Sequence, residues 1–211
     1  MKKKYTINFR ESETPIAEPV TKFGGQPVWI EKPEWAVSRS TGKPMMFVCQ
    51  ISLEKEIFGQ IESKMAYIFI EDDDPMSITW EADGGDNAVI IQPNGNNPTA
   101  ISTEIGPSLY EMKEVENEKF LQPFYCEFSI EATFGEDEED YEEGEFENKI
   151  GGYPRFLQNE EYPSTIKEDW NLLLQLDSAS VPFSINFGDA GVGYAFIFKD
   201  GKTGKFLWQC C

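Results

Sequence analysis

The sequence contains no histidine, and this absence excludes more chemistry than any other feature of its composition. Without histidine the chain cannot form Ser-His or Cys-His nucleophile pairs, histidine-based acid–base catalysts or most zinc sites. Any catalysis would have to use carboxylates, lysine, tyrosine or cysteine. We therefore expect no metal and no cofactor, and we favour a non-enzymatic protein over an enzyme.

Cysteine is also scarce, with four residues and no Cys-x-x-Cys spacing. Cys49 and Cys126 lie in apolar stretches, where cysteine usually acts as a small buried hydrophobic residue. Cys210 and Cys211 form an adjacent pair with no further metal ligands nearby in the sequence. Their role stays open.

Long apolar runs and basic residues are both lacking. No stretch approaches the roughly 20 apolar residues of a membrane-spanning helix, and the basic start of the chain has no signal-peptide core. The 18 basic residues against 38 acidic ones give a formal net charge of −20. Such a surface repels phosphate backbones and anionic lipid, so we expect no nucleic-acid or membrane partner and a cytoplasmic location. It attracts cationic partners, although solubility alone also accounts for it.

What the sequence does contain is one signature that occurs twice. Three blocks recur in the same order, and the two copies lie 125 to 127 residues apart. The pairs are Phe23–Ile30 with Ile150–Leu157, Met46–Ser52 with Asn171–Asp177, and Met65–Ile70 with Val192–Ile197. We interpret the chain as a single internally duplicated domain. Repeat one spans about 21–92, a middle segment with an acidic connector spans 93–147, and repeat two spans about 148–211.

The blocks predict strands and turns rather than helices. A Gly-Gly pair can take positive φ, and the proline that follows excludes helix. Continuous apolar runs are typical of strands buried on both faces. The glutamines within them, Gln50 and Gln175, must satisfy buried amides, so we expect them to bind loop backbone. The fold class that follows is mainly β (α+β), with two pseudo-symmetric antiparallel β-sheet lobes and few short helices.

Between the repeated blocks, Asn87–Gln92 and the alternating stretch Phe124–Phe134 predict further strands. Short helices are predicted within Ile51–Ile61 and Leu109–Lys119. Glu136–Glu147 has nine acidic residues in twelve positions, which predicts a solvated connector, with docking of a basic partner as the alternative.

The ordered blocks also carry a family resemblance. They comprise Gly24–Pro27, Trp35, Gly42–Pro44, Met45–Ile51 and Tyr67–Ile70, and in the second half Gly151–Pro154, Trp170, Leu172–Asp177 and Phe187–Gly191. This set, which covers roughly Thr21–Gln209, resembles the YwqG-like family of bacterial proteins, whose function is not established.

A weaker similarity links Gly42–Phe47 to the programmed-cell-death-two family of eukaryotes, whose members escort a basic ribosomal protein. That family has cysteines before this stretch, whereas Val37–Thr41 has none, so no metal site carries over. The similarity implies protein binding by analogy only.

Several motifs resemble ligand sites but are better interpreted as turns. Gly188–Gly193 precedes a predicted strand rather than a helix, so we expect a tight turn in which Asp189 caps backbone amides. Asp72–Asp74 and the pair Asp83 and Asp86 lack calcium-loop spacing and predict solvated turns at strand ends. The tryptophans are expected in the core or between the lobes, with an aromatic cleft as the rival reading. They are Trp29, Trp35, Trp80, Trp170 and Trp208.

Our leading hypothesis is a non-enzymatic interaction module that binds another protein, a basic one, in an immunity-like or chaperone-like role. The alternative is a small-ligand-binding protein or carboxylate-based enzyme that uses a cleft between the repeats. DNA mimicry by the acidic surface ranks last. No residue is assigned as catalytic, and the oligomeric state stays open. The candidate ligand-binding residues are Trp29, Gln50, Trp170, Gln175, Asp177 and Asp189.

Overall fold

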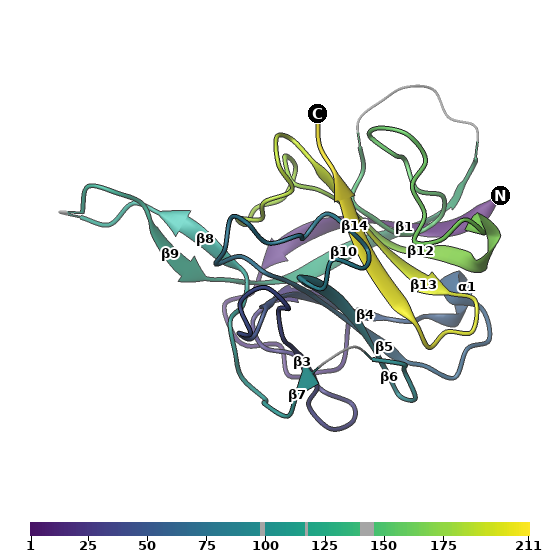
Figure 1. The fold of residues 1–211 in the computed structure, drawn as a ribbon, viewed down its shortest axis with the longest axis horizontal. Coiled ribbons are helices and arrows are strands. Elements are labelled where there is room, and N and C mark those ends of the chain that lie inside the picture. The colour runs from purple at the N-terminus through teal and green to yellow at the C-terminus, as the bar shows by residue number, and fades with distance from the viewer. Residues whose placement is uncertain (98–99, 117, 140–145) are drawn as a thin grey trace.

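The computed structural model of the chain describes residues 1–97, 100–116, 118–139 and 146–211, and its architecture is mainly β (Figure 1). This confirms the predicted fold class at the level of secondary structure. The elements in chain order are β1 (Lys2–Glu11), β2 (Lys22–Gly24), β3 (Trp35–Ala36), β4 (Met46–Ser52), α1 (Lys55–Phe58), β5 (Met65–Ile70), β6 (Asn87–Gln92), β7 (Ala100–Ile101), β8 (Tyr110–Lys113), β9 (Gln122–Tyr125), β10 (Glu127–Asp137), β11 (Lys149–Gly151), the 3-10 turn η1 (Lys167–Asp169), β12 (Trp170–Asp177), β13 (Val192–Phe198) and β14 (Gly204–Gln209).

Ten of these strands form one antiparallel sheet to which both predicted halves contribute. Its order is β14-β13-β12-β11-β1-β10-β2-β4-β5-β6. The long strands β1 and β10 pair along their whole length at the centre. On either side, β11 corresponds in position to β2, β12 to β4, β13 to β5 and β14 to β6. The two groups of strands meet at this central pair. β1, which precedes repeat one, pairs with β11 of repeat two, and β10, from the middle segment, pairs with β2 of repeat one.

The sheet curls until its two edge strands come near each other. Beyond the end of β6, the backbone N–H of Asn96 donates to the carbonyl of Lys202, just before β14, at 2.7 Å. The side chains of Lys205 and Asp83 form an ion pair across the same gap, and the rings of Trp80 and Trp208 meet edge to face at 6.2 Å. The sheet is thus nearly closed, and β6 lies beside β14.

The strands with continuous apolar runs are buried on both faces, as these runs predict; they are β4, β5, β6, β12 and β13. Inward-pointing side chains from both halves, such as Ile51, Ile68 and Leu173, form one shared core inside the curled sheet. The outer face of the first half is covered by a cluster around Trp35 and Tyr67. A separate cluster around Tyr194 and Phe196 covers the outer face of the second half.

The middle of the chain departs from the predictions. Leu109–Lys119, predicted as a helix, instead contains β8, which pairs with β9. The helix predicted within Ile51–Ile61 is confined to α1, and Gly59 with φ of 71° follows it. Neither stretch has an apolar helical face long enough to hold a helix against the sheet.

The strand predicted over Phe124–Phe134 is interrupted at Cys126, between β9 and β10. The backbone N–H of Cys126 donates to Leu109 at 3.1 Å, and its carbonyl accepts from Gly25 at 2.9 Å. Beyond this point the predicted alternation is wrong in the second part of β10, where Ala132 is exposed and Phe134 is 50% exposed.

The predicted acidic connector lies partly outside the described residues, which exclude 140–145. In the described part, Asp137 is 3% exposed, so the expectation of a solvated segment is wrong at this residue. In the described part of the chain, no helix has the length and apolar character needed to cross a membrane.

Candidate binding groove beside the projecting hairpin

Gln50 and Gln175 bind loop backbone, as predicted. The Gln50 side-chain carbonyl accepts from the N–H of Val28 at 2.7 Å, and its amide donates to the carbonyl of Val20 at 2.8 Å. Gln175 accepts from the N–H of Arg155 at 2.7 Å and donates to the carbonyl of Glu147 at 3.0 Å. Each glutamine is fully buried and fastens the segment that follows a Gly-Gly turn to the sheet.

A second pair of matched contacts was not predicted. The hydroxyl of Tyr67 donates to the carbonyl of Val28 at 2.9 Å, and that of Tyr194 donates to Arg155 at 2.8 Å. Gln92 accepts from the N–H of Glu31 at 3.2 Å. Gln209 does the same with Gln158 at 3.0 Å. The signal was present in the sequence, because Gln92 and Gln209 each end the last sheet strand of their half.

Trp29 and Trp170 pack into the outer clusters instead of meeting each other. The ring of Trp29 lies 4.5 Å from that of Tyr67, and its indole nitrogen has no hydrogen-bond partner among the described residues. Trp170 packs edge to face against Phe198 at 5.2 Å, and its nitrogen donates to Ser164 Oγ at 3.0 Å.

Asp177 and Asp189 lie in turns. Asp177 ends β12, and its carboxylate accepts from the N–H of Ala179 at 2.9 Å. The tight turn predicted around Asp189 is present, with Gly188 at φ 74°. Its cap is different from the predicted one, because the Asn186 side chain, two residues before Gly188, accepts the Gly188 N–H at 2.9 Å. The six predicted ligand-binding residues thus lie in separate places, and none lines the groove or the cleft described below. Their role in ligand binding stays a prediction.

A second expected turn carboxylate, Asp86, is buried instead of solvated. It accepts hydrogen bonds from the hydroxyls of Ser38 and Ser40 and from the N–H of Ile78 at 2.8 Å. Burial alone would raise its pKa, but these hydrogen bonds bring the pKa below its ordinary value. The carboxylate fixes the loop before β6.

A buried lysine precedes each Gly-Gly pair, and sequence reasoning missed both. Lys22 precedes Gly24 by two residues, and Lys149 precedes Gly151 by two. Lys22 is 1% exposed and forms an ion pair with Glu127. Lys149 is fully buried and donates to Asp137 at 2.9 Å. The repeated Lys-x-Gly-Gly spacing was the signal that could have revealed them.

Each of these carboxylates also lies against the second glycine of its turn. A side chain at Gly25 would collide with the Glu127 carboxylate, and one at Gly152 would collide with Asp137. Both glycines have positive φ, 64° and 78°. The predicted backbone role of the Gly-Gly pair is confirmed. The second glycine leaves room for a carboxylate to approach the buried lysine.

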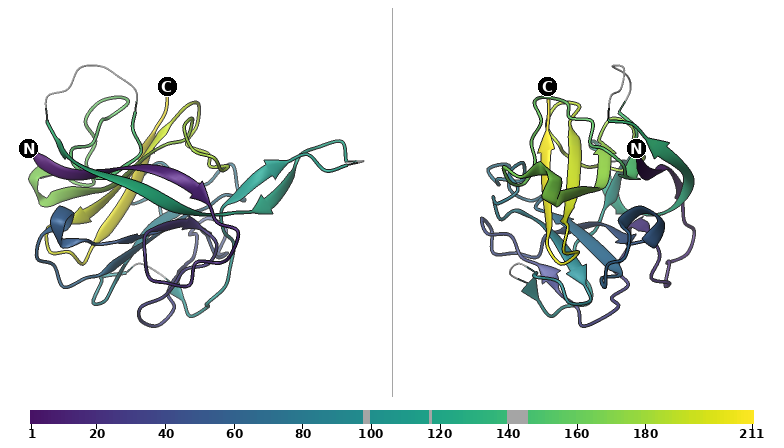
Figure 2. Two further views of the ribbon diagram at one scale, coloured as in Figure 1. Left: turned by 180° about the vertical axis from the view of Figure 1, so that it is seen from behind. Right: turned by 90° about the vertical axis from the view of Figure 1, so that its right-hand side faces the viewer.

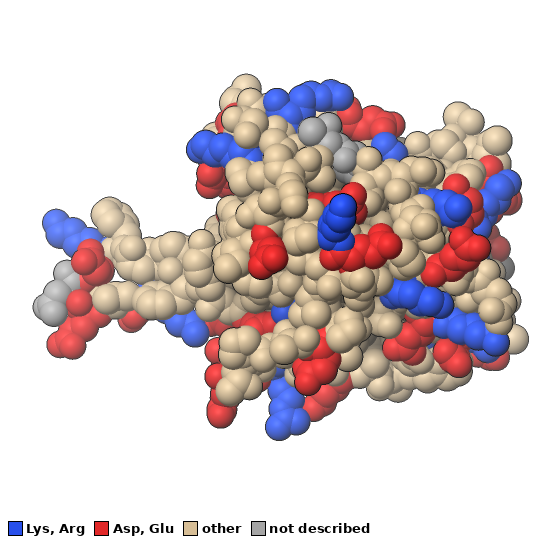
Figure 3. Space-filling model, turned by 90° about the horizontal axis from the view of Figure 1, so that it is seen from below, with Lys and Arg blue, Asp and Glu red and all other residues tan. Residues whose placement is uncertain are grey.

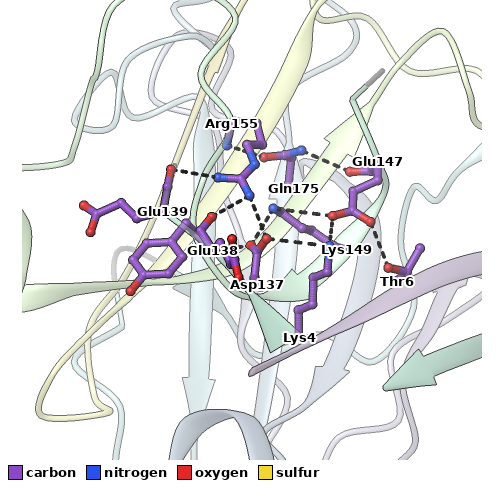
Figure 4. Close-up of polar contacts among 10 residues, drawn as sticks. Lys4, Thr6, Asp137, Glu138, Glu139, Glu147, Lys149, Arg155 and Gln175 are labelled. Atoms are coloured by element: carbon purple, nitrogen blue, oxygen red, sulfur yellow. Dashed lines mark hydrogen bonds and ion pairs between the residues drawn. The ribbon is translucent and has the colours of Figure 1, made fainter. Parts of the chain in front are cut away.

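The second half builds a larger charge cluster around this pair (Figure 4). Arg155 donates to Asp137 at 2.7 Å, Lys4 forms an ion pair with Glu147, and Lys149 lies between the two carboxylates. Burial acts to raise the pKa of Asp137, but hydrogen bonds from Lys149 and the Tyr153 N–H lower it below its ordinary value. A carboxylate held ionised and shut away in this way stabilises backbone and is poorly placed for acid–base chemistry.

The hairpin β8–β9 is unlike the rest of the molecule, because it projects away from the body (Figure 1, Figure 2). In its register Tyr110 lies opposite Tyr125 and Met112 lies opposite Pro123. Cross-strand partners point to the same face of a sheet, so these four side chains form one apolar and aromatic face. At its base the hairpin is held by the N–H of Ser184, which donates to the carbonyl of Tyr110 at 2.8 Å.

This face forms one wall of a groove of about 540 Å³, and an acidic loop from the body forms the other. The loop follows β5 and brings Glu71, Asp72 and Asp73 to the groove. The hydroxyl of Tyr110 donates to Asp72 across it at 2.9 Å. Burial and this hydrogen bond raise the pKa of Tyr110 to about 12. Burial also raises the pKa of Asp72. The hydrogen bond from Tyr110 opposes this shift, and the neighbouring carboxylates of Asp73 and Glu71 add to it.

The hairpin also exposes apolar surface beyond the groove. Large apolar side chains on it are between 43% and 79% exposed, namely Met112, Phe120, Leu121, Phe124 and Tyr125. Figure 3 shows the stem of the hairpin mostly in tan, with acidic and basic side chains gathered at its tip. Surface of this kind on a projecting element is typical of a protein–protein contact.

A family profile described as Domain of unknown function (DUF1963) matches residues 21–206. The chain belongs to this family. The matched part of the DUF1963 domain includes the whole groove and the hairpin, whereas the central strand β1 precedes it. A search of curated proteins finds no match to the chain.

The DUF1963 domain has a second hollow, a cleft of about 430 Å³ where β6 and β14 approach each other. Arg39 and Asp83 line it from the first half, and Thr203 and Lys205 line it from the second. Among the described residues there is no group of three or more acidic or cysteine side chains able to hold a metal ion. The four cysteines are free, and Cys49 and Cys126 are buried as predicted.

Proposed function

We propose that this chain is a non-enzymatic interaction module that binds a basic protein partner, with the hairpin β8–β9 as the docking element. The observation that supports this most directly is the set of exposed apolar side chains on the hairpin, from Met112 at 43% to Phe120 at 79% exposed. Exposed apolar surface costs free energy in water, which association with a partner recovers.

Charge supports the basic character of the partner. The formal net charge is −20, and the groove beside the hairpin is walled by three acidic residues, Glu71, Asp72 and Asp73. A field of this sign steers cationic proteins towards the surface and repels anionic ones. Escort of a basic protein and neutralisation of a basic toxin, a chaperone-like and an immunity-like role, both use this recognition.

The test compares three forms of the chain in pull-downs from a lysate of the native host. The hairpin variant carries Phe120→Ser, Phe124→Ser and Tyr125→Ser. The matched control carries Met76→Ser, Ile105→Ser and Ile166→Ser, which alter equally exposed apolar residues away from the hairpin. We expect quantitative mass spectrometry to identify a basic protein that the wild type and the control retain and the hairpin variant loses.

Binding should then be reproduced with the purified partner. If every captured protein binds all three forms equally, at low and at physiological salt, the hairpin is not the docking element and the proposal fails.

A second candidate function, binding of a small ligand, is favoured by the cleft between β6 and β14. It lies between the two halves and is lined by Arg39, Asp83 and Lys205. Native mass spectrometry of the chain purified from its host should reveal a retained small molecule, and Arg39→Ala should release it. A chain that carries no small molecule in this measurement counts against this function.

We also infer that the two halves arose by internal duplication and that the family matched here is the YwqG-like family of bacterial proteins. Support for the duplication comes from the paired contacts of Gln50 and Gln175 and of Tyr67 and Tyr194, which repeat partner for partner. A cytoplasmic location belongs to the same proposal and rests on the acidic composition.

A further inference from the structure

We propose that the groove beside the hairpin is a receptor for one cationic side chain, a lysine or arginine presented by the partner. This inference rests on the proposed function and deepens it, because it names the group that is recognised.

The hairpin wall suits the stem and the edge of such a side chain. Tyr110, Met112, Pro123 and Tyr125 share one face of the hairpin, and all four line the groove together with Met46. The methylene stem of a lysine or arginine packs well against methionine and proline. The face of a tyrosine ring attracts the cationic head through its quadrupole.

The acidic wall has capacity to accept further hydrogen bonds. Glu71 is already occupied, since it accepts from the N–H groups of Asp72 and Asp73 and from Thr41. Asp72 uses Oδ2 for Tyr110, and its Oδ1 accepts no hydrogen bond from the residues that the structure describes. Within the described part of the chain, the Asp73 side chain forms one exposed ion pair, with Lys43 at 3.4 Å, and a pair of this kind contributes little to stability.

Ser108 provides an independent sign of an absent partner. It lines the groove, it is 2% exposed, and its hydroxyl has no hydrogen-bond partner among the described residues. Buried hydroxyls normally have a partner, so an unpaired one in the lining of a groove points to a ligand that supplies the missing donor or acceptor.

The sign of the ligand follows from what lines the groove. Its described lining residues include three carboxylates and two tyrosines but no lysine or arginine. An anion would be repelled by these carboxylates, since the lining itself carries no positive charge, and a purely apolar side chain would bury the charge of Asp72 with no cation beside it. A cationic head on an apolar stem satisfies both walls.

Methionine methyl NMR tests this directly, because the groove contains two natural reporters. Met46 and Met112 line it, whereas Met76 is 81% exposed and lies outside it. The probes are acetylated and amidated Gly-Gly-X-Gly-Gly peptides in which X is lysine, arginine, norleucine or glutamate. We expect lysine and arginine peptides to shift the Met46 and Met112 signals in a saturable way, with Met76 unchanged, and norleucine and glutamate peptides to have no effect.

Two variants and a matched control complete the design. Asp72→Asn keeps an acceptor for Tyr110 but removes the charge, and we expect it to weaken lysine binding about tenfold. Tyr125→Leu removes the exposed ring and should weaken binding several-fold without affecting the fold, because this side chain is 76% exposed. Glu13→Gln makes the same charge change at an exposed residue outside the groove and should leave binding unchanged.

The inference is overturned if norleucine binds as well as lysine, if the shifts spread to Met76, or if Asp72→Asn and Glu13→Gln behave alike. Any of these results, together with hairpin-dependent capture of a basic partner, leaves the proposed function standing and removes only the groove. Saturable binding of lysine in the groove without hairpin-dependent capture of a partner supports the groove and contradicts the proposed function.

Discussion

The two halves of the molecule hold their Gly-Gly turns with the same hydrogen bonds but with different charges. In both, a buried glutamine accepts an N–H bond of 2.7 Å from the segment after the turn. In the first half, Lys22 meets one acid, Glu127, and donates to the carbonyls of Ile16 and Gln26. In the second half, Lys149 sits in a network of several charges.

The difference has a local cause in the central strands. Glu127 lies opposite Gly24 in the register, and Lys4 lies opposite Gly151. The place that an acid takes in the first half is therefore taken by a base in the second. Asp137, from the far end of the same strand β10, supplies the missing acid. The hydrogen-bond frame is thus the same in both halves, whereas the carboxylate comes from opposite ends of β10.

Removal of the acid in each half should produce the largest difference in stability between the halves. Asp137→Ala leaves Lys149 buried, together with Arg155 and the Tyr153 N–H that the same carboxylate binds. We expect it to lower the free energy of unfolding by about 3–5 kcal/mol in urea denaturation. Glu127→Ala should cost less, because Lys22 keeps two carbonyl partners. Equal losses would show that the larger network adds nothing.

Loss of the buried glutamine should destabilise the two halves equally. Gln50→Leu removes the hydrogen bonds to the N–H of Val28 and the carbonyl of Val20, and Gln175→Leu removes those to the N–H of Arg155 and the carbonyl of Glu147. Each should destabilise by about 1–3 kcal/mol, and by the same amount in both halves. If one of the two substitutions has no effect in the same denaturation assay, the hydrogen bonds have the same geometry in both halves but contribute differently to stability.

At acid pH the charge network of the second half should contribute less to stability. The pKa of Asp137 is below its ordinary value in the folded chain and ordinary in the unfolded one. Its contribution is therefore complete above about pH 4 and is lost as the pH falls through the folded pKa. We expect the difference in free energy of unfolding between wild type and Asp137→Ala to become smaller as the pH falls below about 4. The gap for Gln175→Leu, which removes no titrating group, should stay constant; a parallel narrowing there would assign the effect to general acid unfolding.

The smallest effect on stability is expected on the hairpin. Phe124→Ser and Tyr125→Ser alter side chains that are 45% and 76% exposed. Each should change the free energy of unfolding by less than about 0.5 kcal/mol, in contrast with the loss of binding proposed above. Thermal denaturation of the two variants provides the check. A large loss would indicate that these side chains pack within the fold, and the hairpin would then be part of the core structure.

The sequence was informative wherever a local pattern decides the structure. Continuous apolar runs predicted β4 and β12, the Gly-Gly pairs predicted positive φ, and Gln50 and Gln175 were predicted to bind loops. It failed where distant segments decide. Within Leu109–Lys119, Tyr110–Lys113 forms the strand β8 because it pairs with β9, and the burial of Asp137 depends on Lys149 and Arg155.

The groove itself was out of reach for the same reason. Tyr110 and Tyr125 are brought together by hairpin register, and Asp72 joins them from a loop almost forty residues earlier in the chain. Nothing in the local spacing of these residues distinguishes them from ordinary turn and strand residues. The repeated lysine before each Gly-Gly pair, in contrast, was visible and could have indicated the buried ion pairs.

The central position of β1 has a consequence for synthesis of the chain. Its sheet partners are β10 and β11, which begin at Glu127 and Lys149. This strand is therefore without its neighbours until synthesis has passed β10 and β11, and its pairing closes a very long loop, which slows folding. During this interval the nascent chain presents an unpaired strand of ten residues, so early translation is the stage at which this protein is most exposed to misassembly.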